Sequence, residues 1–248
     1  MIVSQYHPGT RWRLRVLRAT LPISADDLVL DAGCGDGYIS SQLAKLANKV
    51  VGVDIAQGII ERNRKIFDLP NLRFFTCDLN DLGDRFSKNA FSVIICIDVL
   101  EHAYGFKRIL DNFCYCLRND GFLYFTIPLR NHGHFAYGTK EVVDILYEKR
   151  FRVVHLTKIA PPPITLNLMR IFYRASNMLY GKSSEPDVWT DTKAFKLAEK
   201  EPKIFKLYRF LFFPILNRLT YMDRKPYKTG NTLLVMGSKR EDIKGPVL

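Results

Sequence analysis

The sequence contains few cysteines and no cysteine motif. The chain has five cysteines among 248 residues, an odd number, and they show neither CxxC spacing nor histidine partners. A disulfide framework and a structural zinc site are therefore not expected. The cysteines lie inside apolar runs, so we expect reduced thiols in the core of a cytoplasmic protein. They are Cys34, Cys77, Cys96, Cys114 and Cys116.

Long apolar runs are also missing. Four arginines between residues 11 and 18 interrupt the N-terminal segment, which lacks the continuous apolar stretch of a secretory signal. No apolar run reaches the ~20 residues that a transmembrane helix requires. We therefore expect no integral membrane segment and a cytoplasmic location.

Acidic residues are too few to balance the basic ones, and the imbalance is local. The net charge is +12, and residues 158–230 hold 14 Lys and Arg against six Asp and Glu. Two thirds of the basic excess thus lies in one late segment. A local excess of positive charge indicates that residues 158–230 contact an anionic surface or a polyanion.

The hydrophobic pattern from residue 28 onward alternates short runs rich in Val, Ile and Phe with longer stretches of helical spacing. This alternation is typical of βαβ units and a parallel sheet. Internal repeats and low-complexity tracts are absent. We expect strands near 28–32, 50–54, 72–76, 91–97, 121–127, 151–159 and 231–239, and helices near 38–47, 57–67, 105–118 and 139–149.

A glycine-rich loop follows the first predicted strand. The segment VLDAGCGDGYIS places Gly33, Gly35 and Gly37 between a strand and a helix. Glycine allows sharp turns and close backbone approach to a ligand, and the helix offers free N–H groups. Two acidic residues, Asp54 and Asp78, follow the second and third strands. In an open parallel sheet these strand ends meet at one edge, so we expect a ligand site there.

Three segments resemble the first three motifs of the class I S-adenosylmethionine-dependent methyltransferases: D-x-G-C-G-D-G, V-x-V-D-I and C-D-L. The resemblance spans residues 28 to about 127. It implies a Rossmann-like, seven-stranded, doubly wound α/β sheet whose last strand is antiparallel. About seventy residues separate the last two strands, which is long for a connection within a domain, so we expect a helical insertion there. The expected segments are an N-terminal helical cap (1–27), the cofactor-binding core (28–160), a basic amphipathic insertion (161–230) and the final strand with a tail (231–248).

The resemblance also implies roles for single residues. The glycines would hold the methionine moiety of S-adenosylmethionine, Asp54 the ribose and Asp78 the adenine amino group. Asp31 would fix the loop and the cofactor amine. The further cofactor contacts expected are Ile55 and Leu79, which would flank the adenine, and Ile97 at the end of the fourth strand. No metal is expected in the cofactor site.

Two other interpretations fit these motifs less well. An acidic residue after the second strand also suits NAD, but Ser40 stands where the G-x-G-x-x-G fingerprint requires its third glycine. The glycines and aspartates could also belong to ordinary turns, which three motifs in register argue against.

The fourth strand runs into ICIDVLEHAYG, which is similar to the D-V-L-E-H stretch of small-molecule methyltransferases, including those of ubiquinone and menaquinone biosynthesis. A helical turn over residues 98–102 would bring Asp98, Glu101 and His102 to one face. Three interpretations stay open: a general base, with His102 or Glu101 as catalytic candidates; a divalent metal held by all three; or a polar cluster lining the cofactor pocket.

Two further segments lie near the expected site. His132 and His134 follow the fifth strand, and His132 is the third catalytic candidate. Near the N-terminus, Tyr6, His7, Arg11 and Trp12 resemble an aromatic, arginine-bearing segment that caps the cofactor in related enzymes. The alternative for this last segment is a surface helix with scattered arginines.

The insertion interleaves large apolar residues with Lys and Arg, as in KIFKLYRFLFFPILNRL. This composition suits an amphipathic lid, either alone or in peripheral contact with an anionic membrane. An RNA or protein substrate is a further alternative, although the segment after the fourth strand lacks the N/D-P-P-Y/F motif of many base-amino methyltransferases. The sequence thus predicts methyl transfer to an oxygen or carbon of a small-molecule or lipid-linked acceptor, with a noncatalytic cofactor-binding protein as the remaining alternative.

Overall fold

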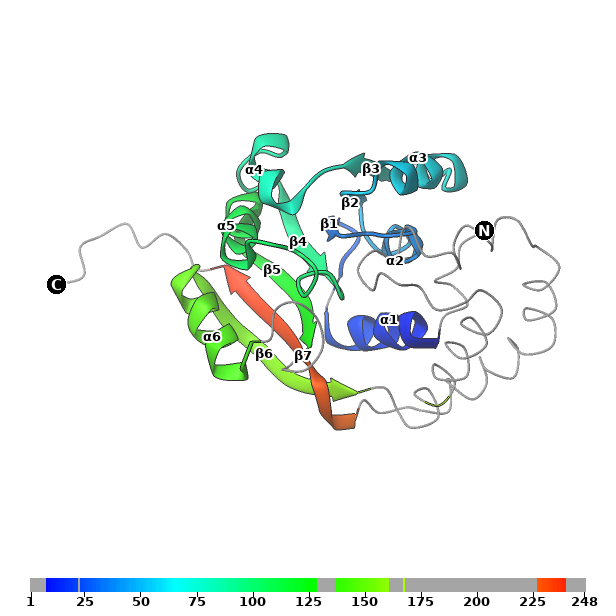
Figure 1. The fold of residues 1–248 in the computed structure, drawn as a ribbon. Coiled ribbons are helices and arrows are strands. Elements are labelled where there is room, and N and C mark those ends of the chain that lie inside the picture. The colour runs from blue at the N-terminus through cyan, green and yellow to red at the C-terminus, as the bar shows by residue number, and fades with distance from the viewer. Residues whose placement is uncertain (1–7, 22, 129–136, 161–166, 168–226, 240–248) are drawn as a thin grey trace.

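One twisted sheet forms the centre of the molecule (Figure 1). The computed structural model describes residues 8–21, 23–128, 137–160, 167 and 227–239. Within these residues the sheet has seven strands in the order β3-β2-β1-β4-β5-β7-β6. The strands are β1 (Leu28–Ala32), β2 (Lys49–Asp54), β3 (Leu72–Thr76), β4 (Phe91–Cys96), β5 (Leu117–Pro128), β6 (Phe151–Ala160) and β7 (Tyr227–Lys239).

Strand direction determines where a ligand site can form. The pairs β1–β2, β1–β4, β2–β3 and β4–β5 are parallel, whereas β7 runs antiparallel to both β5 and β6. The carboxyl ends of β1 to β5 therefore lie at the same edge of the sheet. The predicted seven-stranded α/β sheet with an antiparallel last strand is confirmed.

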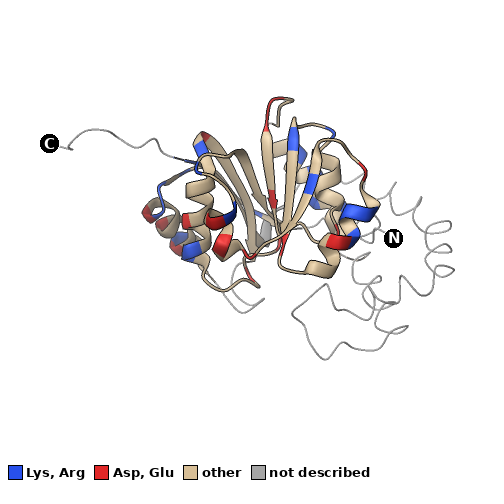
Figure 2. Ribbon diagram, turned by 90° about the horizontal axis from the view of Figure 1, so that it is seen from above, with Lys and Arg blue, Asp and Glu red and all other residues tan. Residues whose placement is uncertain are grey.

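Helices cover both faces of the sheet, as the view from above shows (Figure 2). One apolar cluster joins the sheet to α1, α2 and α3, and a second cluster joins the opposite face to α5 and α6. Both faces of β4 are consequently buried along its whole length. The helices are α1 (Pro8–Thr20), α2 (Tyr38–Leu43), α3 (Gln57–Ile66), the 3-10 turn η2 (Leu79–Asp81), α4 (Leu82–Arg85), α5 (Phe106–Cys116) and α6 (Thr139–Glu148).

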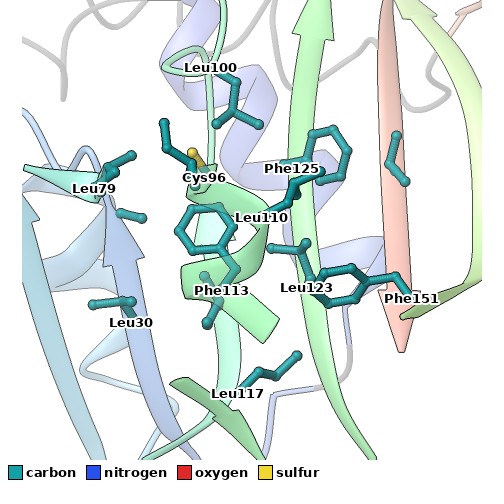
Figure 3. Packing of buried hydrophobic residues seen from close by; sticks show 14 of the residues in the cluster. Leu30, Leu79, Cys96, Leu100, Leu110, Phe113, Leu117, Leu123, Phe125 and Phe151 are labelled. Carbon is teal, nitrogen blue, oxygen red and sulfur yellow. The ribbon is translucent and has the colours of Figure 1, made fainter. Parts of the chain in front are cut away.

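Helix α5 shows how the apolar spacing builds the core. Phe106, Ile109, Leu110 and Phe113 recur at helical intervals and are all at most 3% exposed. They pack onto β4 and β5 next to Leu123 and other strand residues (Figure 3). Burial of each such side chain contributes roughly 1.5–3 kcal/mol. The core thereby anchors the loop that precedes α5, which belongs to the candidate site.

The cysteines are not joined to one another. All five cysteines are free thiols, three of them buried and two partly buried. Among the described residues, no helix is long and apolar enough to cross a membrane.

The predicted insertion, residues 161–230, lies almost entirely outside the described residues. Only Asn167 and residues 227–230 are described, and the latter already belong to β7, which starts four residues before the predicted strand. The lid and membrane interpretations of this segment therefore stay predictions.

Candidate active site

The glycine loop turns back over the end of β2. Gly33, Gly35 and Gly37 all have positive φ angles, +79°, +50° and +75°, which glycine adopts without steric cost. The N–H groups of Gly33 and Cys34 both donate to the carbonyl of Val53 at 2.8 Å. The neighbouring strand thus fixes the start of the loop.

The three glycines serve different spatial needs. A Cβ at Gly33 would lie 2.3 Å from a methyl carbon of Val99, and one at Gly37 would lie 2.8 Å from the rings of Phe67 and Phe74. A Cβ at Gly35 would meet nothing within 4 Å. Gly33 and Gly37 are therefore required for packing, whereas Gly35 faces open space that a ligand can approach.

Asp54 stands at the end of β2 and is held by backbone amides. Its Oδ2 accepts the N–H of Gly35 and its Oδ1 accepts the N–H of Ala56, both at 3.0 Å. Each carboxylate oxygen has a second lone pair left to accept another hydrogen bond. A pair of acceptors held in this way suits the two hydroxyls of a ribose. The adjacent Ile55 is 68% exposed, so it offers an apolar surface beside them.

Two buried polar residues support the loop from beneath. Asp31 is 3% exposed and accepts the hydroxyl of Ser40 at 2.6 Å, which ties β1 to α2. Burial, the largest cause, raises the pKa of Asp31 to about 6. Asn63 of α3 is fully buried and donates its side-chain amide to the carbonyl of Gly35 at 2.7 Å. We did not predict a role for Asn63, although its place on the apolar stripe of α3, beside Ile59 and Ile60, marks it as unusual.

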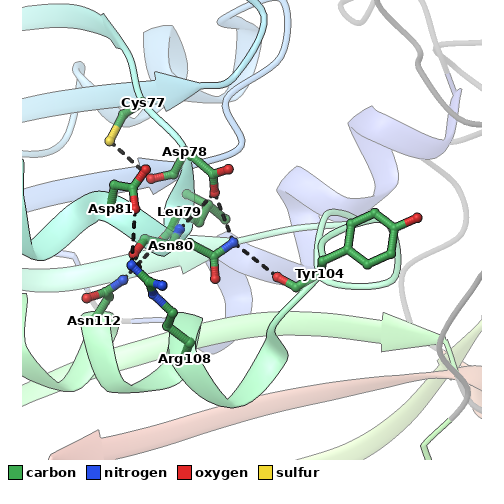
Figure 4. Close-up of polar contacts among 8 residues, drawn as sticks. All are labelled: Cys77, Asp78, Leu79, Asn80, Asp81, Tyr104, Arg108 and Asn112. Carbon is green, nitrogen blue, oxygen red and sulfur yellow. Dashed lines mark hydrogen bonds and ion pairs between the residues drawn. The ribbon is translucent and has the colours of Figure 1, made fainter.

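Asp78 lies in a turn after β3 (Figure 4). Its Oδ1 accepts both the backbone N–H of Asn80, at 2.8 Å, and the side-chain amide of Asn80, at 3.0 Å. Among the described residues, its Oδ2 has no hydrogen-bond partner. Leu79 points into the core at 7% exposure, and Ile97 is half-buried against the cluster on the other face of the sheet. Of the three expected apolar contacts, Ile55 alone presents most of its side chain to solvent.

The segment after β4 departs from the expected helical turn. Asp98 has a φ of +54°, in the left-handed region, and the turn that follows closes with a bond from the His102 N–H to the Val99 carbonyl. Glu101 is consequently buried at 8% exposure, while His102 is exposed. The helical turn that would have brought these three side chains to one face is therefore not formed. Within the described parts of the chain, no three His, Cys, Asp or Glu side chains form a group able to hold a metal ion.

Asp98 is fixed by residues from two distant elements. Its N–H donates to the Thr126 hydroxyl at 3.0 Å, and its Oδ1 accepts that hydroxyl at 3.1 Å. Its Oδ2 forms an ion pair with Arg13 of α1. Helix α1 itself packs onto the sheet through Trp12 and Leu17. The cofactor cap and the surface helix both stay predictions for this segment, because Tyr6 and His7 lie outside the described residues. Nothing in the sequence around Thr126 or Arg13 indicates that these residues contact Asp98.

Glu101 is the least satisfied acid of the site. Its Oε2 is buried and has no hydrogen-bond partner among the described residues. Burial is the main cause that raises the pKa of Glu101 to about 7; the charge of Asp98 adds to it and that of Arg13 opposes it. A carboxyl with a pKa near neutrality is suited to accept and release a proton at physiological pH. His132 and His134, with Tyr6 and His7, lie outside the described residues.

Comparison with known proteins agrees with this arrangement. The sequence profile of one family, described as a methyltransferase domain, matches residues 29–121. A ubiquinone biosynthesis O-methyltransferase of Coxiella burnetii is 31% identical over 123 residues, which are 48% of this chain and 52% of that protein. The chain thus matches about half the length of this curated relative.

Solved structures share the fold at low identity. An S-adenosylmethionine-dependent methyltransferase from Mesorhizobium loti superposes with a TM-score of 0.59 at 15% identity, over 92% of this chain and 98% of that one. Phosphoethanolamine N-methyltransferase 2 of Haemonchus contortus, in complex with S-adenosyl-L-methionine, gives 0.61 at 17% identity, over 93% and 53%. Residues 29–121 therefore match a methyltransferase domain, and the chain has the fold of solved S-adenosylmethionine-dependent methyltransferases.

Proposed function

We propose that this protein transfers the methyl group of S-adenosylmethionine to an oxygen or carbon of a small-molecule or lipid-linked acceptor. The observation that carries the proposal is the open Gly35 backbone beside a carboxylate, Asp54, whose two oxygens are fixed by backbone amides. Asp78, whose Oδ2 has no hydrogen-bond partner among the described residues, stands at the end of the next strand. The three positions suit the amino-acid, ribose and adenine parts of this cofactor.

When bound, S-adenosylmethionine supplies a methyl group activated by its sulfonium. The chain's own residues then bind and orient. The glycine loop receives the amino-acid part, Asp54 accepts the ribose hydroxyls and Asp78 accepts the adenine amine. Such positioning is the main means by which a protein accelerates a displacement between two held reactants.

We propose Glu101 as the group that takes a proton from the acceptor. It is buried next to the glycine loop, because Val99 of the same turn packs against Gly33. Its Oε2, which has no hydrogen-bond partner in the described part of the chain, and its raised pKa favour it over His102, which lies at the surface. An oxygen acceptor such as a phenol is the first candidate, since the relative from Coxiella burnetii bears the name of an O-methyltransferase.

We propose in addition that residues 161–230 bring the enzyme to lipid-linked acceptors. The support is compositional: residues 161–230 hold 13 Lys and Arg against six Asp and Glu, so +7 of the net charge of +12 falls in a segment rich in Phe, Leu and Ile. Such segments bind anionic membranes through apolar burial and charge together.

Transfer of a labelled methyl group tests the proposal. The purified protein would be incubated with methyl-labelled S-adenosylmethionine and phenolic acceptors, with and without a polyprenyl tail, beside RNA and protein fractions. We expect label in the phenolic acceptors and a loss of roughly 10²-fold or more in rate for Glu101→Gln. Label found only in RNA or protein would overturn the acceptor class, and an unchanged rate for Glu101→Gln would remove its role as the base.

A further inference from the structure

The side-chain amide of Asn80 joins two turns that come from different strands (Figure 4). One of its hydrogen bonds goes to Oδ1 of Asp78 at 3.0 Å, and the other goes to the carbonyl of Tyr104 at 3.1 Å. An amide NH₂ has two protons, so this side chain spends its full donor capacity on the two turns.

The contact with Asp78 sets the orientation of that carboxylate. Oδ1 receives two hydrogen bonds from Asn80, one from the backbone and one from the side chain. Rotation of the carboxylate would break both bonds. The other oxygen, Oδ2, which has no partner among the described residues, is therefore held in one direction, ready to accept a donor from a ligand.

The contact with Tyr104 reaches the turn that carries Glu101. Gly105 follows with a φ of +79°, and a Cβ there would lie 2.7 Å from Oδ1 of Asn80. The absence of a side chain at Gly105 is thus what allows Asn80 to approach. Tyr104 is itself 74% exposed beside the turn. Asn80 consequently connects the turn after β3 with the segment between Glu101 and α5.

The turn after β3 has other braces that do not involve Asp78. Arg108 donates to the carbonyl of Asn80 at 3.0 Å and pairs with Asp81 at 3.3 Å. Asn112 donates its side-chain amide to the carbonyl of Leu79 at 2.9 Å. Both come from α5 and act on the backbone or the far side of the turn. The turn should therefore keep its shape when only the side chain of Asn80 is shortened.

We propose that Asn80 is a positioning residue that fixes Asp78 for recognition of the 6-amino group of adenine and joins adenine binding to the turn bearing Glu101. This inference rests on the proposed function. Under it, selectivity for an adenine nucleoside depends on a residue that makes no contact with the base itself, and cofactor binding orders the segment from Asp98 to Tyr104.

Calorimetric titration with two ligands tests the first half. The ligands are S-adenosylhomocysteine and its analogue whose purine lacks the 6-amino group. For Asn80→Ala we expect about a tenfold loss of affinity for S-adenosylhomocysteine and less than about a twofold loss for the analogue, because the analogue has no amine for Asp78 to accept. The matched control is Asn112→Ala, which removes an amide bond to the same turn and should affect both ligands equally.

Hydrogen exchange tests the second half without any need for turnover. S-adenosylhomocysteine should slow exchange in residues 98–105 of the wild type and of Asn112→Ala, and this protection should shrink in Asn80→Ala at saturating ligand. Equal losses for both ligands, or unchanged protection in Asn80→Ala, would overturn the role of Asn80 while leaving the proposed function intact. No binding of S-adenosylhomocysteine by the wild type would instead overturn the proposed function, and this inference with it.

Discussion

The carboxyl ends of β2 and β4 each present an acid, but the two acids are held in opposite ways. Asp54 receives a backbone N–H on each oxygen, from residues of its own turn and of the adjacent glycine loop. Glu101 is buried, and its Oε2 receives nothing from the described residues. Under the proposed function, the first acid recognises the ribose hydroxyls and the second takes a proton from the acceptor.

The glycine loop beside Asp54 meets the turn that bears Glu101 where Gly33 lies against Val99. Changing Gly33 to Ala should therefore have the largest effect on both. A φ of +79° costs an alanine roughly 1–2 kcal/mol, and overlap with Val99 adds a further 1–3 kcal/mol. We expect the free energy of unfolding, measured in urea, to fall by about 3 kcal/mol.

Two companion variants sharpen that result. Gly35→Ala should cost only the backbone strain, roughly 1 kcal/mol, since its Cβ would meet nothing within 4 Å. Adding Val99→Ala to Gly33→Ala should restore part of the loss. Equal destabilisation by Gly33→Ala and Gly35→Ala would show that packing of the glycine loop against Val99 does not contribute to stability.

The burial of Glu101 should make the free energy of unfolding depend on pH. Its pKa in the folded protein is raised from the usual 4.5 to about 7, so the folded state binds the proton more tightly than the unfolded state. The stability this group contributes is fully present below about pH 4.5 and is lost as pH rises through about 7. Glu101→Gln removes that loss. We expect it to raise the free energy of unfolding by roughly 3 kcal/mol at pH 8 relative to wild type, and to change it little at pH 4.5.

Urea unfolding at the two pH values measures this difference directly. A variant that is equally stabilised or destabilised at both would mean that Glu101 does not change its ionisation between them. Methyl transfer by the wild type should in the same range rise with pH through about 7, because a base must be deprotonated to act.

Arg13 should have a smaller effect on the same acid. Its charge opposes the rise in the pKa of Glu101 and pairs with Asp98, with both side chains partly exposed. Arg13→Met should lower the free energy of unfolding by about 1 kcal/mol and move the pH profile of methyl transfer to higher pH. The control is Arg18→Met, on an exposed position of the same helix, which should change neither. If Arg13→Met left the pH profile of methyl transfer unchanged, α1 would have no influence on the pKa of Glu101.

The contrast between the end of β2 and the end of β4 also explains what the sequence could predict. The sequence predicts the strands, the glycine loop and Asp54 because these features are local. Each depends on a strand, a turn and a helix that follow one another within a few residues. The turn at 98–102 is not local. Its left-handed start at Asp98 is fixed by Thr126, 28 residues away, and by Arg13 from α1, so helical spacing alone could not predict its geometry.

Polar residues inside helices and turns were missed for a related reason. Asn63 and Asn80 bond to Gly35 and to Tyr104, partners that adjoin them only in the folded chain. The early start of β5 at Leu117 has a similar origin, because a register shift opposite Phe91 and Val93 extends the strand past the predicted boundary.

The most direct test of the account is calorimetric titration of the protein with S-adenosylhomocysteine, alongside Asp54→Ala and a control, Asp68→Ala, at an exposed position just after α3. The account predicts that the wild type and Asp68→Ala bind alike and that Asp54→Ala loses affinity by about tenfold or more, because two fixed acceptors are removed. Binding that is absent in the wild type, or unaffected by Asp54→Ala, would contradict it.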